Sequence, residues 1–144
     1  MRPAQLARTL ASSLIGGVAQ VAWSASLYRV RHALDSEGRP LLLCRTGGAL
    51  DRVLCAGDVA TVITVAGCRG RVWISGWAMP LLGDDARAGA MEFAARNPLS
   101  DLLDVGNAFC LYRLDVAEVR LEHADELIDV DVDDYASAVS EPVT

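Results

Sequence analysis

The sequence predicts a mainly β domain of the α+β class, built around a small barrel of six or seven mostly antiparallel strands with three or four peripheral helices. The chain has 144 residues, the length of one ordinary domain, and 52% of them are apolar, enough to fill a core. Short apolar runs separated by Gly- and Pro-containing turns are typical of antiparallel strands. The longest run changes its apolar phase partway, as expected where a sheet curls into a barrel.

The first third of the chain predicts a helix followed by three strands. Residues 3–15 are expected to be helical, because Pro3 suits a first turn, leucines recur every four residues, and Gly16 and Gly17 follow. A strand is expected over 18–24. Residues 27–34 alternate as a second strand, whose apolar face carries Tyr28, Val30, His32 and Leu34. The turn at 35–40 leads into a third strand at 41–45, which completes a hairpin.

The middle of the chain predicts two helices and two strands. A short helix follows Thr46 and two glycines, and ends near residue 56. Residues 59–65 are apolar on both faces and therefore predict a central strand, and 71–77 follow across a tight turn. A helix is expected over 84–97, with Asp84 as its N-cap and Pro98 as its stop.

The last third predicts one long strand, one short strand and a terminal helix. Over residues 109–122 the apolar set changes phase after Val116, which predicts a β-bulge or a sharp bend. A short strand is expected at 127–130 and a helix at 133–139. We find no internal repeat or linker, so residues 1–144 predict a single domain.

The charge composition excludes several classes of function. All 13 basic residues are arginine, which excludes Schiff-base chemistry and a P-loop, because both need lysine. The net charge is -6, and the segment from Asp115 onward holds ten acidic residues and one arginine. Such an acidic chain argues against binding to nucleic acid or to an anionic membrane.

The compartment follows from the cysteines and from one uncharged stretch. The four cysteines form no close pair, so we expect reduced packing thiols: Cys44, Cys55, Cys68 and Cys110. Residues 9–28 carry no charge and imitate a targeting signal, but serines, a glutamine and a glycine pair make them too polar to span a membrane. The sequence therefore predicts a cytoplasmic protein.

Two segments are candidates for binding an anionic ligand. Arg45 and Thr46 lie where a strand passes through glycines into a helix, a pattern that favours phosphate or carboxylate, although it also fits an ordinary capped turn. Arg71, Trp73 and Trp77 share a strand face with Ser75. That face could form an electropositive wall for a planar anionic ring, or equally a core or dimer face.

Metal-binding patterns are weak. His32 and His123 could each ligate a haem iron, but His32 also fits a buried, hydrogen-bonded histidine and His123 a solvated loop. The acidic run from Asp129 begins like a calcium loop, yet it lacks the glycine and the final glutamate, so an acidic helix cap at Asp131 or Asp133 is favoured. We predict no metal site.

The order of several segments resembles the FMN-binding split-barrel superfamily, whose fold is that of pyridoxamine 5'-phosphate oxidase. Within it, the sequence is most similar to the haem-iron-utilisation type. The resemblance covers nearly the whole chain and rests on five segments: Ala7-Arg8-Thr9-Leu10, Gly38-Arg39-Pro40-Leu41-Leu42-Leu43, residues 69–77, Leu111-Tyr112-Arg113-Leu114-Asp115-Val116 and Asp134-Tyr135.

This resemblance implies a six-stranded barrel that forms a homodimer, with a cofactor groove at the subunit interface. Arg45 and Thr46 match the positions that hold the FMN phosphate, and Arg71 and Trp73 match positions on the following strands. Members often place a lysine in this groove, and this chain has none. Longer members carry a second, α/β domain, which is expected to be absent here because the sequence stops soon after Glu141.

Three functions follow from the resemblance. The first is a flavin-nucleotide-binding barrel with oxidoreductase chemistry supplied by the flavin. The second is a haem or tetrapyrrole binder, or a regulator, without catalysis. The third is a degenerate barrel that serves as a dimeric scaffold. The sequence leaves open whether the protein is an enzyme.

Overall fold

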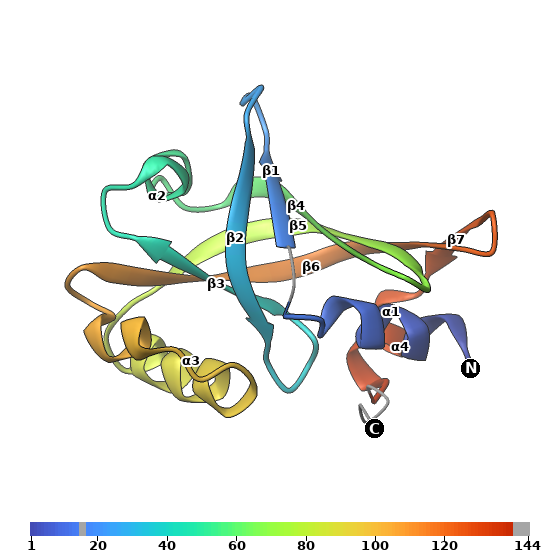
Figure 1. Ribbon diagram of the computed structural model, residues 1–144. Coiled ribbons are helices and arrows are strands. Elements are labelled where there is room, and N and C mark those ends of the chain that lie inside the picture. The colour runs from blue at the N-terminus through green and yellow to red at the C-terminus, as the bar shows by residue number, and fades with distance from the viewer. Residues whose placement is uncertain (15–16, 140–144) are drawn as a thin grey trace.

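The computed structural model describes residues 1–14 and 17–139 and forms a mainly β fold (Figure 1). The helices of the described residues are α1 (Pro3–Ala11), α2 (Ala49–Leu54), α3 (Gly83–Arg96) and α4 (Val132–Ser137), with a 3₁₀ helix at Ser100–Asp104. The strands are β1 (Gly17–Val21), β2 (Leu27–Leu34), β3 (Pro40–Arg45), β4 (Val59–Gly67), β5 (Gly70–Leu81), β6 (Phe109–His123) and β7 (Glu126–Val130).

Six of these strands close into an antiparallel barrel. The strand order is β3-β2-β1-β4-β5-β6-β7, and a further pairing of β3 with β6 joins the two ends of the six-stranded part. Every pairing between named strands is antiparallel. Strand β7 pairs only with the far half of β6, outside the barrel. The predicted split barrel of the α+β class is therefore confirmed.

The bulge predicted in the long strand is present. Ser75 of β5 pairs with Glu118, but the next residue, Gly76, pairs with Val116, so Ala117 has no partner in the ladder. An extra residue bends its strand and increases the twist. This bend allows the first half of β6 to pair with β3 while its second half continues to β7.

Two apolar cores lie on opposite faces of the sheet. The interior of the barrel is filled by fully buried residues such as Leu42, Ile63 and Leu114, and α1 adds Leu6 and Leu10 to the same core. The second core lies outside the barrel, where Phe93 of α3 packs with side chains of β3 and β6. Strand β3 is therefore buried on both faces, which explains its unbroken run of leucines.

A buried arginine joins segments that are distant in sequence. Arg8 of α1 is only 5% exposed, and its Nη1 donates to the carbonyl oxygens of Tyr135 (2.9 Å) and Ala136 (3.0 Å) in α4. Its Nη2 lies 3.5 Å from the carbonyl oxygen of Ser36, in the β2–β3 turn. The hydroxyl of Tyr135 donates to the carbonyl oxygen of Gly38 in that turn, at 2.6 Å. These contacts fasten α1, α4 and the β2–β3 turn to one another.

Several predicted boundaries were wrong. The first helix ends at Ala11 rather than 15, and β1 ends at Val21 because Trp23 adopts a positive φ of 64°, which breaks the strand. Helix α3 begins after Leu82, so Asp84 lies in its first turn and does not cap it. The 3₁₀ helix was not predicted. Gly16, Ser140 and Glu141 lie outside the described residues.

Among the described residues, no helix combines the length and the apolar character needed to cross a membrane.

Candidate functional site

One part of the outer sheet surface carries all three tryptophans of the chain. Trp73 and Trp77 lie on β5, and Trp23 lies in the β1–β2 turn. Trp23 is 105% exposed and Trp77 is 50% exposed, while Trp73 is half-buried. Large apolar side chains gathered on a surface are typical of a ligand or partner site. We call this surface, on the outer side of β1, β4 and β5, the tryptophan face.

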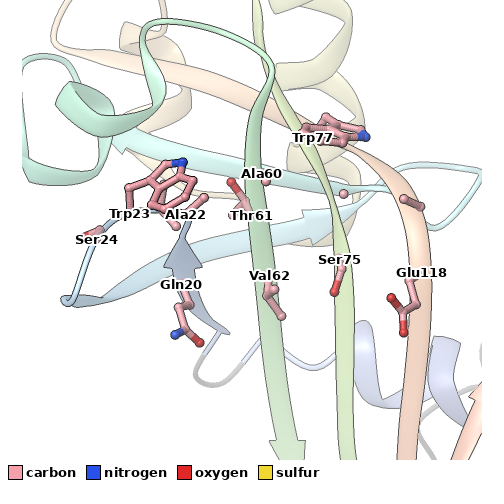
Figure 2. Close-up of a pocket in the computed structure, with 13 residues that line it drawn as sticks. Gln20, Ala22, Trp23, Ser24, Ala60, Thr61, Val62, Ser75, Trp77 and Glu118 are labelled. Carbon is pink, nitrogen blue, oxygen red and sulfur yellow. The ribbon is translucent and has the colours of Figure 1, made fainter.

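The strand register fixes the order of side chains on this face. Burial alternates along β5, so Arg71, Trp73, Ser75 and Trp77 all point outward, as the sequence predicted. Across the strands, Ser75 lies in one row with Gln20 of β1, Val62 of β4 and Glu118 of β6. Figure 2 shows this row crossing the four strands, with the indoles of Trp23 and Trp77 on the same side of the row.

The tryptophan face holds two hollows that share Gln20. The larger has a volume of about 540 Å³, with Trp23 and Trp77 among the residues that line it, and Ala22 and Ala60 between them (Figure 2). The smaller, of about 340 Å³, is lined by Trp73, Arg71 and parts of β1 and β4. No residue of a described helix lines either hollow. The two hollows thus adjoin at Gln20, on the same face of the sheet.

Arg71 supplies a positive charge to the smaller hollow. It is the one arginine that lines either hollow among the described residues. Its guanidinium carbon lies 5.7 Å from the centre of the Trp73 ring, a cation–π contact that holds the charge over the strand. Within the described part of the chain Arg71 forms no ion pair, although Glu122 lies directly across from it on β6. Its guanidinium is therefore available to an anionic ligand.

Beside its apolar side chains, the larger hollow is lined by neutral polar groups and one carboxylate. Gln20 is exposed and Ser75 is half-buried, and they offer an amide and a hydroxyl that can donate and accept hydrogen bonds. The carboxylate of Glu118 is paired with the guanidinium of Arg120 at 3.1 Å, and Arg120 also pairs with Asp129 at 3.1 Å, so this edge of the hollow keeps a net negative charge that disfavours an anion. The hollow therefore suits an uncharged planar ring with polar edges, whereas the charged part of a ligand would lie at Arg71.

The structure separates Arg45 and Thr46 from this face. Arg45 ends β3 and is paired with Phe109 at the start of β6, whereas Arg71 is paired with Glu122 near its end. About 40 Å of strand lies between these two positions, at roughly 3.3 Å per residue. The guanidinium of Arg45 lies 5.9 Å from the Phe109 ring. Arg71 and Trp73 are thus brought together, as are Arg45 and Thr46, but the two pairs lie far apart.

The glycine turn after Arg45 already holds an anion of the chain itself. The N–H of Gly47 donates to Oδ2 of Asp51 at 2.8 Å, and the hydroxyl of Tyr112 donates to Oδ1 of Asp51 at 2.5 Å. The thiol of Cys110 also points to this carboxylate, at 3.3 Å. Burial opposes ionisation of Asp51, but these hydrogen bonds outweigh it and lower its pKa. The turn therefore binds a carboxylate of α2, from the chain itself.

The two histidines lie elsewhere. His32 is 2% exposed, its Nε2 donates to the carbonyl oxygen of Ala11 at 2.8 Å, and its Nδ1 lies so close to Gly17 that a methyl group there would be 2.7 Å away. Burial lowers the pKa of His32. His123 ends β6, and its Nδ1 lies 2.7 Å from the carbonyl oxygen of Arg69. Neither histidine lines a hollow of the tryptophan face.

The remaining candidates have structural explanations. In the described part of the chain, no three His, Cys, Asp or Glu side chains are grouped to hold a metal ion. Asp131 caps α4, because its Oδ1 accepts the N–H of Asp134 at 3.0 Å, as predicted. Cys44 is a buried free thiol, and its burial raises its pKa to about 12. Cys55 and Cys68 are exposed, so the prediction of packing thiols was wrong for these two.

Comparison with known proteins is informative only at the level of structure. No protein-family model matches the chain, and no curated protein sequence matches it. The fold is similar to that of a haem-binding protein from Mycobacterium smegmatis, at 23% identity and a TM-score of 0.79, covering 99% of this chain and 64% of that one. The chain thus spans less than two thirds of the length of that protein.

Two further solved structures share this architecture. An FAD-binding protein from Mycobacterium smegmatis is 11% identical with a TM-score of 0.59, covering 83% of this chain and 93% of its own. PhzG from Burkholderia lata, solved with tetrahydrophenazine-1-carboxylic acid, is 15% identical with a TM-score of 0.53, covering 88% and 86%. This chain has the split-barrel fold. At identities of 23% or less, these likenesses establish the fold alone. The ligand has to be inferred from the residues of this chain.

Sequence reasoning missed Trp23 and Gln20. Both lie in the segment expected to be one continuous strand, where alternation gives no sign that the chain turns after Val21. The available signal was the composition of the turn itself, since an indole followed by Ser-Ala-Ser is unusual inside a buried strand.

Proposed function

We propose that this split barrel binds a flavin nucleotide of the FMN class on the tryptophan face. The observation that carries the proposal is the gathering of all three tryptophans and one arginine without an ion pair at two neighbouring hollows that share Gln20. The flavin ring would lie in the larger hollow, and its phosphate would lie at Arg71.

The ring fits the larger hollow by its chemistry. Aromatic side chains stack on planar heterocycles at about 1–3 kcal/mol per ring, which favours a ligand that contacts Trp77. The polar edge of a flavin carries carbonyl oxygens and ring nitrogens, and the amide of Gln20 and the hydroxyl of Ser75 can bond to such groups. A neutral ring is also compatible with the carboxylate of Glu118 at the edge of this hollow, which would repel the phosphate.

The distance between the hollows suits one phosphate arm. Ser75 and Arg71 are four residues apart on β5, or about 13 Å at 3.3 Å per residue. The seven bonds that join a flavin ring to its phosphorus span about 9 Å when extended. The arginine side chain covers the remainder, so a phosphate over Trp73 would meet the guanidinium of Arg71.

A bound flavin would supply hydride and electron transfer, which makes oxidoreduction the reaction class to test. The chain's own residues would bind and orient the flavin. The indoles would stack on the ring, Gln20 and Ser75 would form hydrogen bonds with its polar edge, and Arg71 would pair with the phosphate. The FAD-binding protein and PhzG, which share the fold, support a ligand with a planar ring.

A tetrapyrrole is the second candidate, because the haem-binding protein has the highest TM-score among these three likenesses. Its propionates could meet Arg71, and its ring could contact the indoles. The described residues that line the hollows include no histidine or cysteine, so a haem there would lack an axial ligand from this chain. The face therefore fits a flavin better than a haem.

A homodimer is part of the proposal. A site that used all four predicted residues, Arg45, Thr46, Arg71 and Trp73, would need two copies, because Arg45 and Arg71 pair with opposite ends of β6 within one chain. Light scattering is expected to report twice the chain mass, and a monomer at micromolar concentration would contradict this part. The cytoplasmic location stays a prediction.

The experiment compares three ligands on two variants. Equilibrium dialysis and visible spectra with FMN, riboflavin and haemin are expected to give one FMN bound per chain. Arg71→Ala should weaken FMN binding about tenfold, as expected for loss of one charge-assisted contact at an exposed site, and leave riboflavin unchanged. Arg87→Ala, an exposed arginine on α3, is the control. No binding of FMN by the wild type would refute the proposal.

A further inference from the structure

Trp23 has an unusual backbone and an unusual exposure. Its φ is 64°, in the left-handed region, which bulky residues adopt rarely and at a cost. Its side chain is 105% exposed, so the indole has no packing contact that would offset this strain. The stability of the fold therefore gives no reason for a tryptophan at this position.

Local hydrogen bonds hold the turn that presents this indole. The N–H of Ser24 donates to the carbonyl oxygen of Val21 at 3.1 Å, and the N–H of Ser26 reaches Oγ of Ser24 at 3.3 Å. The hydroxyls of Ser24 and Tyr28 lie 3.0 Å apart. Before the turn, the N–H of Ala22 donates to the carbonyl oxygen of Ala60 at 2.9 Å. The backbone is fixed by these bonds, while the indole can change rotamer.

The indole stands across the larger hollow from Trp77. Ala22 lies beside Ala60, and Ala60 is paired with Trp77 on the next strand. Two strand spacings, or about 10 Å, therefore separate the strands that carry the two indoles. The residues between them have small side chains, and Figure 2 shows both indoles over this side of the sheet. This arrangement leaves room for one planar ring on Trp77, within reach of Trp23.

We propose that Trp23 is an aromatic lid, which closes over a planar uncharged ring bound against Trp77. The strained turn holds the indole at the rim of the hollow, where a change of rotamer brings it onto the exposed face of the ring. The inference rests on the proposed function, because it takes the flavin ring as the occupant. It adds that the ring is held between two indoles, one from β5 and one from the β1–β2 turn.

A lid acts on release more than on entry, because it contacts the ring only after the ring is bound. Loss of the Trp23 indole should therefore raise the dissociation rate of the flavin and leave its association rate nearly unchanged. Since the lid contacts the ring and not the phosphate, riboflavin and FMN should be affected by the same factor. Arg71→Ala, in contrast, should affect FMN alone.

The test measures both rate constants by stopped-flow flavin fluorescence, for riboflavin and FMN separately. Trp23→Ala is expected to raise both dissociation rates about tenfold, as expected for loss of one stacking contact, with association rates within a factor of two. Trp23→Phe, which keeps an aromatic ring, should have dissociation rates close to those of the wild type. Leu103→Ala, which removes an apolar side chain that is 92% exposed, is the matched control and should change nothing.

Four results would overturn the lid, the last of them together with the proposed function. Unchanged dissociation rates in Trp23→Ala, or a change for FMN alone, would show that the indole does not hold the ring. The difference in acrylamide quenching of tryptophan fluorescence between the unliganded wild type and Trp23→Phe gives the accessibility of Trp23. If this indole is shielded, a second copy covers it and it is not a lid. If the wild type binds neither flavin, the proposed function fails as well. If it binds both and Trp23→Ala behaves like the wild type, only the lid fails.

Discussion

Replacing Arg8 by methionine should destabilise the fold more than replacing the exposed Arg71 or Arg87 by alanine. The guanidinium is buried and donates to the carbonyl oxygens of Tyr135 and Ala136 at 2.9 and 3.0 Å, with a longer contact to Ser36. It also lies 5.4 Å from the centre of the Tyr135 ring. Methionine keeps much of the apolar stem but provides no donor, so carbonyl oxygens from two segments lose the guanidinium, and that of Tyr135 keeps only the N–H of Ala138 at 3.3 Å.

The magnitude follows from these contacts. A hydrogen bond to a charged group contributes about 1.5–3 kcal/mol, and a carbonyl left buried without a donor costs about 1–3 kcal/mol. The cost of burying the guanidinium, which lowers its pKa, offsets part of this. We expect a net loss of about 3 kcal/mol, since water can reach the partly buried carbonyl of Ala136. For a domain of this size, that loss lowers the melting temperature by roughly 10 °C.

The assay is urea unfolding followed by circular dichroism, with thermal melting as a second measure. Tyr135→Phe removes only the hydroxyl that donates to Gly38, and should cost about 1.5 kcal/mol. The double variant should lose less than the sum, because the two side chains are in contact. Arg87→Ala is the control. A loss below about 1 kcal/mol for Arg8→Met would refute this account of how α1, α4 and the β2–β3 turn are held.

Three further predictions concern pH, the bulge and the anion site. Burial holds the pKa of His32 below its ordinary value, so the unfolded chain takes up a proton more readily than the folded one. Stability that is present above pH 6.5 should therefore be lost as the pH falls, by up to about 1.4 kcal/mol per pH unit. If the free energy of unfolding of His32→Asn changes between pH 7.5 and 5.5 as steeply as that of the wild type, this explanation is wrong. Gly76→Ala should cost about 3 kcal/mol in urea unfolding, since a Cβ there would meet the carbonyl oxygen of Asp115, and an unchanged midpoint would contradict the close approach at the bulge. Glu122→Gln should tighten FMN binding about twofold by removing the carboxylate across from Arg71, while an equal effect on riboflavin would argue against phosphate at Arg71.

Much of the barrel could be predicted because its signals are local. Residues 27–34 alternate cleanly and form β2 with those bounds, and the phase change after Val116 coincides with the bulge. The unbroken leucines of β3 reflect burial on both faces, by the barrel interior and by α3. In each case the side chains of one short segment report on the surface that the segment faces.

The site could be predicted only in part, because its geometry depends on long-range pairing. Alternation placed Arg71 and Trp73 on one outer face, but only the pairing of β6 with both β3 and β5 shows how far Arg45 lies from them. The positive φ of Trp23 has no signature in a sequence. The contact of Arg8 with Tyr135, 127 positions away, joins two segments that the family resemblance singled out without giving either a role.

The central claim is that a planar flavin ring binds on the tryptophan face, and equilibrium dialysis of FMN against wild type and Trp77→Ala tests it most directly. The account predicts one FMN retained per wild-type chain and at least tenfold weaker binding by Trp77→Ala, in a variant that remains folded because Trp77 is half exposed and outside the core. Equal retention of FMN by the two proteins, or no retention by the wild type, would contradict it.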